Sequence, residues 1–331
     1  MTGTLDFARE AGEGGLPSGQ PESTAQQIAA RSPLELFWRR LKTDKVAMTA
    51  LVFIVILILL AVFAPLVVKL VGERPPNQQS TKFLDEFGTP KGPSADNLFG
   101  ADTLGRSVFS RVLYGARVSL EVALIATAIS VTIGVTVGLV AGFFRGWVDT
   151  IASRVIDVLL AFPILLLALG LAAACSFGNG CLGGLIQPGL SVVIFVIAFV
   201  NWTYIARIIR GQVLSLREKE FVDASRSLGA GNTRILFKEL LPNLVAPIIV
   251  YSTLIIPQNI LFEASLSFLG VGVQPPDASW GSMLADATEI FDTAWWYMLF
   301  PGLALLLTVL AFNLLGDGLQ DALNPRASRS N

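Results

Sequence analysis

The chain alternates between long apolar runs and shorter polar segments, and this pattern predicts a bundle of membrane-spanning helices. Six runs have the composition of spans, at residues 46–71, 119–144, 155–174, 190–205, 244–269 and 295–315. The first run is long enough, at 1.5 Å rise per residue, to cross about 30 Å of hydrocarbon with some tilt. We therefore predict an all-α polytopic membrane protein with six transmembrane helices and both termini on one side of the membrane.

A short amphipathic segment precedes the first span. Ser32 and Glu35 form a capping box with Pro33 at the first helical position, which predicts a helix over residues 32–45. Its apolar face and its basic residues suit a helix that lies on the membrane surface, with Trp38 at headgroup level. A plain extension of the next helix is the alternative interpretation.

The other segments divide the chain further. The N-terminal tail buries too little apolar surface to offset its ordering entropy, so we expect it to be disordered. An extracytoplasmic loop with an amphipathic helix from about Ser107 follows the first span. The N-terminal tail covers residues 1–31, and the extracytoplasmic loop with its helix covers residues 72–118. The core with the remaining spans covers residues 119–316, and a cytoplasmic C-terminal tail covers residues 317–331.

Basic residues in the short loops orient the bundle. They precede the first span and lie between spans two and three and between spans four and five: Arg39, Arg40, Lys42, Lys45, Arg145, Arg154, Arg207, Arg210, Arg217, Lys219, Arg226, Arg234 and Lys238. The opposite loops after spans three and five carry no Lys or Arg. Because short cytoplasmic loops are rich in Lys and Arg, both termini are predicted to be cytoplasmic. Arg106, Arg111 and Arg117 are exceptions, in a long loop that also contains acids.

The longest of the predicted cytoplasmic loops, residues 215–243, is punctuated as a helix, a turn and a second helix. Ser215 and Glu218 form a capping box that predicts a helix ending at Leu228, because Gly229 can adopt the left-handed conformation that ends a helix. A second short helix is expected over residues 234–241, closed by Pro242. The helix caps and the glycine at set spacing favour a folded docking surface over a merely solvated loop. Membrane spans tether the loop at both ends, which leaves little room for a helix that enters a DNA groove.

This loop resembles the EAA motif, the cytoplasmic loop of ATP-binding-cassette (ABC) import permeases. Asp223, Ala224 and Ser225 stand at the Glu-Ala-Ala triplet, Gly229 has the required spacing, and Leu241-Pro242 closes the motif, whereas Ser225 and Glu239 depart from it. The resemblance implies a type I importer transmembrane domain with a cytoplasmic coupling helix that docks into an ATPase subunit. The residues that it assigns to this contact are Glu220, Phe221, Asp223, Ala224, Ser225, Leu228, Gly229, Leu241 and Pro242.

A second block, before span two, resembles one branch of that family, the peptide and nickel importers. Its Gly-Thr-Asp-x-x-Gly-Arg-Asp pattern is matched at Asp102, Gly105 and Arg106, Ser110 also matches the block, and Ala101 and Ser107 depart. Asp102, Gly105 and Arg106, with Arg111, form the predicted outer segment. Residues 266–272, 275–276 and 280–281 are similar to the end of span five and the adjoining loop in the same branch.

Composition limits the chemistry that this chain can perform. The chain is 53% hydrophobic and 15% charged, and it contains no histidine and two cysteines, which excludes a Cys/His metal centre and the usual general base. It also has no P-loop to hold ATP phosphates. We therefore expect no metal site and no cofactor here, with ATP and magnesium bound by partner subunits. Cys175 and Cys181, near the outer face, could form a disulfide or remain two thiols.

Polar side chains inside the predicted spans are candidates for function. Glu263, preceded by Gln258 and Asn259, lies toward the outer end of span five, and Asn201 lies in span four. Charge inside a membrane is costly and usually functional. Glu263 is expected either to line or gate a substrate path or to pair with an arginine of the outer helix.

The resemblance covers residues 98–317 and implies one permease subunit of an ATP-driven importer of dipeptides or oligopeptides, in a bacterial cell membrane. Nickel or another small solute is the alternative cargo. The implied partners are a homologous second permease, two ABC ATPase subunits and an extracytoplasmic solute-binding protein, besides the lipid bilayer, and no nucleic acid. An ion-coupled secondary carrier and an intramembrane enzyme are the rival functions. Few titratable groups lie at mid-membrane, which disfavours the carrier.

Overall fold

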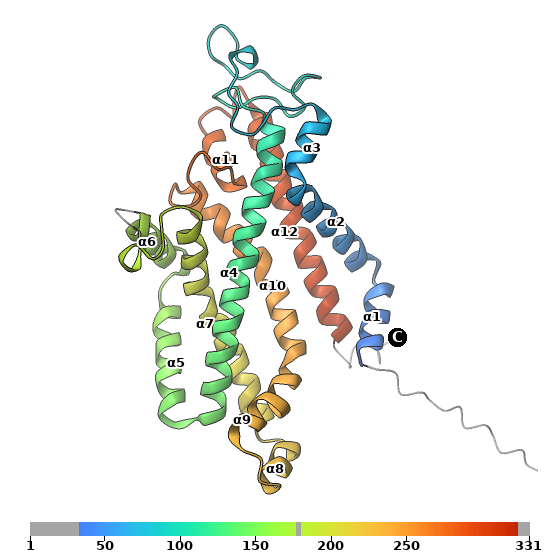
Figure 1. The fold of residues 1–331 in the computed structure, drawn as a ribbon, viewed down its shortest axis with the longest axis vertical. Coiled ribbons are helices and arrows are strands. Elements are labelled where there is room, and N and C mark those ends of the chain that lie inside the picture. Colours follow the sequence, from blue (N-terminus) through green and yellow to red (C-terminus); the bar gives the residue numbers. More distant parts are fainter. Residues whose placement is uncertain (1–32, 177–179, 324–331) are drawn as a thin grey trace, which may run out of the picture.

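A computed structural model describes residues 33–176 and 180–323, and its regular elements are all helices (Figure 1). They are α1 (Pro33–Thr43), α2 (Lys45–Val62), α3 (Ala64–Val71), α4 (Val108–Phe144), α5 (Gly146–Ala161), α6 (Ile164–Ser176), α7 (Leu190–Leu216), α8 (Glu220–Ser227), α9 (Asn232–Arg234), α10 (Leu241–Phe268), α11 (Trp280–Ala287) and α12 (Trp295–Leu323). Single turns of 3-10 helix occur at Thr81–Phe83 and Leu182–Gly184, and a π-helical stretch, Ile235–Leu240, precedes α10. The all-α prediction is confirmed.

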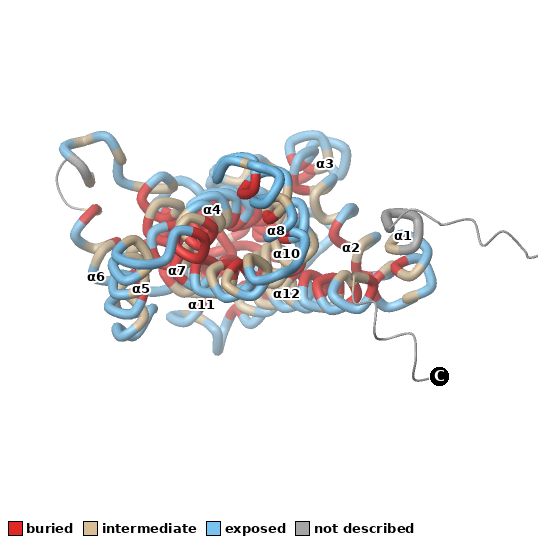
Figure 2. Tube along the Cα trace, turned by 90° about the horizontal axis from the view of Figure 1, so that it is seen from below, coloured by how far each residue is buried: buried red, intermediate tan, exposed pale blue. Residues whose placement is uncertain are grey.

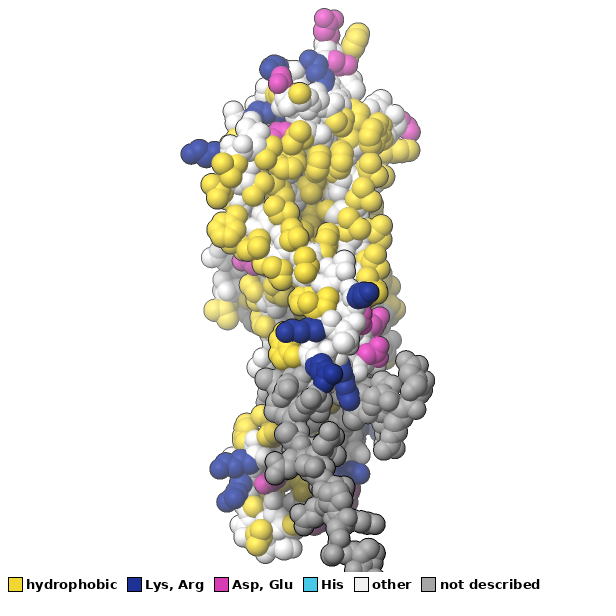
Figure 3. Space-filling model, turned by 90° about the vertical axis from the view of Figure 1, so that its right-hand side faces the viewer, with side chains coloured by type: hydrophobic (Ala, Val, Ile, Leu, Met, Phe, Trp, Pro, Cys, Tyr) yellow, Lys and Arg dark blue, Asp and Glu magenta, His cyan; other side chains and the backbone are white. Residues whose placement is uncertain are grey.

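Five helical stretches in the described part of the chain are long and apolar enough to cross a membrane, and the bent pair α5 and α6 would make a sixth span. Side chains coloured by type show a broad apolar surface with charged groups above and below it (Figure 3). One end of the bundle carries α8, and the other carries α11 and the long loop before α4 (Figure 1). We call these the α8 end and the α11 end.

The third span is broken, which the hydropathy pattern does not predict. One helix is expected over residues 155–174, but α5 and α6 meet at an angle of 90°. The break falls at Phe162, whose backbone is extended (φ −81°, ψ 144°), directly before Pro163. Because proline disfavours the helical conformation in the residue before it, the helix ends there.

The first span also has a break, between α2 and α3. Pro65 lies in the first turn of α3, so its missing N–H cannot continue the α2 ladder. At the start of α2, Asp44 accepts hydrogen bonds from the backbone N–H groups of Val46 and Ala47, which separates α1 from α2. Ser32 of the predicted capping box lies outside the described residues.

Two predicted boundaries fall inside continuous helices. The amphipathic segment from about Ser107 and the second span form one helix, α4, so the limit between residues 118 and 119 has no structural counterpart. At the other end of the chain, α12 continues to Leu323, beyond the limit drawn at residue 317. Helix α4 starts at Val108 because Val108 and Val112 are buried against residues of α11 and α12, and α12 continues because Leu319 and Ala322 pack against α1 and α2.

The centre of the molecule is the contact between α4 and α7, where buried positions are concentrated (Figure 2). Three glycines, one turn apart on α4, face three branched side chains of α7: Gly134, Gly138 and Gly142 against Ile205, Ile209 and Val213. A Cβ atom at Gly138 would lie 2.7 Å from the Ala206 carbonyl oxygen and 2.9 Å from the Cβ of Ile209. Such small residues allow two helix backbones to approach closely.

Gly138→Ala is therefore expected to force α4 and α7 apart and to lower stability, by about 1–3 kcal/mol for an overpacked core. The added Cβ meets backbone atoms, which cannot rotate away. Gly211→Ala is the matched control, because Gly211 lies on α7 and a Cβ atom added there would meet no neighbouring atom within 4 Å. The apparent melting temperature of the detergent-purified protein should fall for Gly138→Ala alone, and equal values for both variants would contradict this packing.

Candidate functional site

The α8 end is formed by a short helix and the chain that returns from it into α10. Helix α8 begins at Glu220, after an extended Lys219 that provides no side-chain cap. The predicted capping box is wrong, since Ser215 lies within α7 and Glu218 pairs with Arg145 at 2.7 Å. Helix α7 continues past Ser215 because Val213 and Leu216 still pack against the core.

Gly229 ends α8 as the sequence predicts. Its φ is +80°, its N–H donates to the Arg226 carbonyl at 2.9 Å, and the Ala230 N–H donates to the Ser225 carbonyl at 3.0 Å. This pair of bonds is the Schellman arrangement, in which a left-handed residue satisfies the last carbonyls of a helix.

The return segment differs from its prediction. In place of a separate helix over residues 234–241, α9 continues through the π-helical stretch into α10. Pro242 does not close a helix; it lies exposed in the first turn of α10. Proline is common in the first turn of a helix, and here that turn directly follows the π-helical stretch.

Helix α8 has one anchored side chain and one exposed apolar stripe. Val222 is fully buried among core residues that include Ile235 and Leu240. On the outward face, Phe221 is 37% exposed and Leu228 is 88% exposed. The sequence pattern predicts that Val222 shares one apolar face with Phe221 and Leu228. In the structure Val222 instead points into the bundle and anchors the helix there. The described chain leaves the outward stripe uncovered.

Arg217, directly after α7, joins the end of that helix to the end of α4, and the sequence pattern does not reveal this contact. Its guanidinium donates to the carbonyl oxygens of Phe143 and Gly142, at the end of α4. Burial lowers the pKa of Arg217 below its ordinary value, and neighbouring charges contribute less. A cation suits the partial negative charge of a helix C-terminus.

Further ion pairs join α5 to α7 near the same end. Arg210 binds Asp149 through two hydrogen bonds, and Arg207 contacts Asp157 at 2.6 Å. Together with the Arg145–Glu218 pair, they tie α5 and the end of α4 to α7, from which the chain enters α8. A displacement of α8 would therefore act on α4, α5 and α7 together.

The polar residues inside the bundle form two closed clusters. Glu263 is fully buried and accepts hydrogen bonds from the hydroxyls of Ser119 and Ser267, both at 2.7 Å. The predicted pairing with an arginine is wrong; serines of α4 and α10 provide the contacts. At this site the carboxylate holds α4 against α10, and it does not face an open path in this conformation.

The second cluster links three helices through amide groups. The side-chain amide of Asn201 on α7 donates to Asn259 on α10 at 2.5 Å, and Asn259 donates to Thr127 on α4 at 2.7 Å. Asn259 is fully buried, whereas Gln258 is exposed. Hydrogen bonds of this kind are typical helix–helix contacts in membrane proteins.

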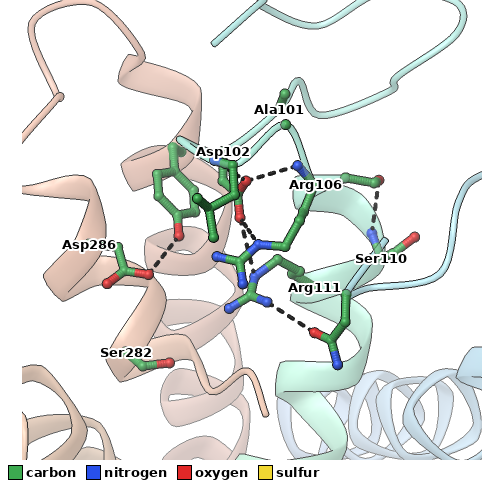
Figure 4. Close-up of polar contacts among 12 residues, drawn as sticks. Ala101, Asp102, Arg106, Ser110, Arg111, Ser282 and Asp286 are labelled. Carbon is green, nitrogen blue, oxygen red and sulfur yellow. Dashed lines mark hydrogen bonds and ion pairs between the residues drawn. The ribbon is translucent and has the colours of Figure 1, made fainter. Parts of the chain in front are cut away.

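Asp102 is the centre of a buried ionic cluster at the α11 end (Figure 4). One carboxylate oxygen accepts from the backbone N–H groups of Leu104 and Arg106, and the other accepts from Arg106 Nε at 2.6 Å. Arg111 Nε lies 3.6 Å from the same oxygen, and Arg111 also donates to Asn77 at 3.3 Å. The structure thus brings the predicted outer residues Asp102, Arg106 and Arg111 together.

Gly105 shapes the turn that carries this cluster. Its φ is +68°, and a Cβ atom there would overlap the Ser80 carbonyl oxygen. Its own carbonyl accepts from Arg74 at 2.8 Å. Burial lowers the pKa of Arg74, while Glu73 and Asp102 act in the opposite direction. Glycine at this position is therefore needed both for backbone conformation and for space.

Several partners of the outer segment lie far away in the sequence and have no local signal. The Trp296 indole donates to the Ala101 carbonyl at 3.1 Å, and the Trp280 indole donates to the Val112 carbonyl at 3.0 Å. Glu73 accepts from the Leu98 N–H and the Ser107 hydroxyl. The Trp296 contact fastens the loop to α12, the Trp280 contact joins α11 to α4, and Glu73 ties the start of the loop to its end at Ser107.

Cys175 and Cys181 form a disulfide, with their Cα atoms 4.8 Å apart. Of the two interpretations of this cysteine pair, the structure has the bridged one. The bond links the last turn of α6, which contains Cys175, to the segment that leads to α7. Among the described residues, no group of three or more His, Cys, Asp or Glu side chains could hold a metal ion.

Comparisons with known proteins agree with this architecture. Residues 134–329 match the family model described as binding-protein-dependent transport system inner membrane component, and residues 32–85 match the N-terminal transmembrane domain of oligopeptide transport permease C. A chain of the MetNI methionine ABC transporter has a similar fold, with a TM-score of 0.53 and 18% identity over 65% of this chain and 96% of that one. The fold is that of a type I ABC importer transmembrane domain.

Similar sequences extend over nearly the whole chain. The dipeptide transport system permease protein DppC of Alkalihalophilus pseudofirmus is 40% identical, over 91% of this chain and 92% of that protein. The glutathione transport system permease protein GsiD of Escherichia coli O157:H7 is 39% identical, over 97% of this chain and 98% of that protein. The chain therefore belongs to the family of inner membrane permeases of binding-protein-dependent ABC importers.

Proposed function

We propose that this chain is one permease subunit of an ATP-driven importer of short peptides. The cargo is inferred from the relatives, whose names specify dipeptides and glutathione and whose similarity covers more than nine-tenths of the chain. The absence of a three-residue metal-ligand cluster from the described residues gives no support to nickel as an alternative cargo.

The observation that carries the mechanism is the uncovered apolar stripe of α8. Phe221 and Leu228 are held outward because Val222 and the Gly229 turn fix the helix from behind. A short helix that lays an apolar face into a groove is a common recognition mode. We assign the stripe to a cleft in an ATPase subunit, with Glu220, Asp223, Ala224, Ser225, Leu241 and Pro242 around it.

The ion pairs behind α8 would transmit the movement. When the ATPase subunits close on ATP, α8 would be displaced. Arg217 would carry that displacement to α4 and the partly buried Arg210–Asp149 pair would carry it to α5, whereas the exposed Arg145–Glu218 pair would contribute little. The cavity between this chain and a second permease would then change from one opening to the other, as alternating access by rigid bodies requires. ATP and magnesium would bind in the ATPase subunits, and this chain would catalyse no reaction.

Partner sites follow from the orientation. By the positive-inside rule, the α8 end and both termini would lie in the cytoplasm of a bacterial cell, on the side of the ATPases. The α11 end, with Asp102, Gly105, Arg106 and Arg111, would face the solute-binding protein. Exposed Gln258 and partly exposed Asn201 would border the path, and Glu263 would fix α10 beside it.

Reconstitution tests the function directly. The chain would be produced with the second permease, ATPases and binding protein of its own genome and inserted into proteoliposomes. We expect uptake of labelled dipeptides and glutathione that requires ATP and the binding protein, and that stops when the ATPase P-loop lysine is replaced. Uptake sustained by a proton or sodium gradient without ATP would favour an ion-coupled carrier and contradict the proposal, and uptake of nickel alone would contradict the cargo.

A further inference from the structure

A groove between α2 and α12 lies on the exposed apolar surface of the bundle. It encloses about 400 Å³ and is lined by Lys45, Val46, Thr49, Ala50, Phe53, Leu307, Leu310, Ala311 and Leu314. From Lys45 to Phe53, eight residues along α2, the groove extends roughly 12 Å. Its walls are apolar except at one end, where Lys45 and Thr49 lie.

Among the described residues that line the groove, Lys45 is the one that carries a charge, and it is exposed. The last turn of α1 places a second exposed lysine, Lys42, three residues away, and basic side chains gather below the apolar surface on this side of the molecule (Figure 3). The acids at this end do not line the groove: Asp44 is bound to the start of α2, and Asp317 and Asp321 lie past Leu314 on α12.

We propose that the groove binds one anionic glycerophospholipid, with an acyl chain along Phe53, Leu307 and Leu314 and its phosphate at Lys45. Lipid tails gain little from apolar contact alone, because the surrounding bilayer offers the same contact. Selective retention therefore depends on the charge at the groove end, and basic pockets between transmembrane helices bind anionic headgroups in this way. The lipid would fill the space between α2 and α12 at the level where α1 meets the headgroups.

The test uses the full chain purified with its copurifying subunits, in nanodiscs of phosphatidylcholine with a minor fraction of phosphatidylglycerol. Native mass spectrometry would count the lipids retained after release into detergent. We expect one retained phosphatidylglycerol per chain and about fivefold less for Lys45→Gln, since one basic residue contributes about that factor. Thr49→Phe, which fills the groove, should remove the retained lipid altogether.

Matched controls separate this site from general lipid contact. Lys69→Gln removes an exposed lysine from α3, and Val52→Phe adds bulk to an exposed position of α2 outside the groove. Both should retain the lipid as the wild type does. Equal retention in Lys45→Gln and the wild type, equal retention of phosphatidylcholine, or a cross-link from Thr49→Cys to a second permease that excludes lipid would each overturn the proposal.

Discussion

Leu228→Asp is expected to reduce ATP-driven uptake at least about thirtyfold while the membrane bundle stays folded. The Leu228 side chain is 88% exposed, so its replacement removes almost no contact within this chain. In the proposed complex the same position would be buried against an ATPase subunit, where an unpaired carboxylate is costly and loss of an apolar anchor removes about 2 kcal/mol or more of binding. Uptake by proteoliposomes and copurification of the ATPase subunits measure the two consequences.

Ser227→Asp is the matched control for this change. It places the same charge on the neighbouring residue of α8, about 100° around the helix from Leu228, and Ser227 is also exposed. Uptake should stay near that of the wild type. If both variants transport normally, the outward stripe of α8 is not the ATPase contact; if both fail alike, charge at this end and not the stripe is responsible.

Local signals in the sequence predicted the end of α8 and not its beginning. Gly229 must adopt a positive φ, and only a residue without Cβ does so without strain, so a single glycine specifies the turn. Ser215 and Glu218 offered an equally clear capping pattern, but Val213 and Leu216 continue the buried face of α7 through it. Tertiary packing therefore overrode a local cap.

The break in the third span had a local signal that hydropathy concealed. Residues 155–174 are apolar apart from Asp157, so the hydropathy pattern alone predicts one span. Pro163 changes the conformation of Phe162 without changing the hydropathy, and the chain turns by 90° there. Prolines 247 and 257, by contrast, lie inside α10, which is continuous around them.

Contacts between distant segments could not be predicted from one sequence. Arg217 is one basic residue among several in its loop, and its partners at the end of α4 are more than seventy residues away. Glu263 could be identified as costly in a membrane, but its partner Ser119 lies 144 residues earlier. The sequence thus identifies Glu263 as a residue that needs partners and suggests an arginine as the partner. In the fold, serine hydroxyl groups are the partners instead.

Asp102→Ala is expected to loosen the whole outer segment, at a cost of roughly 3–5 kcal/mol, because it leaves buried positive charge without its partner. Asp102 is fully buried, and Arg106 and Arg111 are only 9% and 3% exposed. The variant also removes the acceptor of two backbone N–H groups, those of Leu104 and Arg106. Limited proteolysis of the loop before α4 and the apparent melting temperature of the purified protein both report this change.

Two further variants separate the buried charge from the loss of a surface contact. Asp96→Ala breaks the ion pair with Lys82 in the same loop, where both side chains are about 70% exposed, and it should change neither readout, because exposed pairs contribute little. Adding Arg111→Met to Asp102→Ala removes one of the stranded cations and should recover part of the lost stability, since an apolar replacement relieves the uncompensated charge. If the double variant is no more stable than Asp102→Ala alone, the backbone hydrogen bonds of Asp102, and not its charge, hold the outer segment in place.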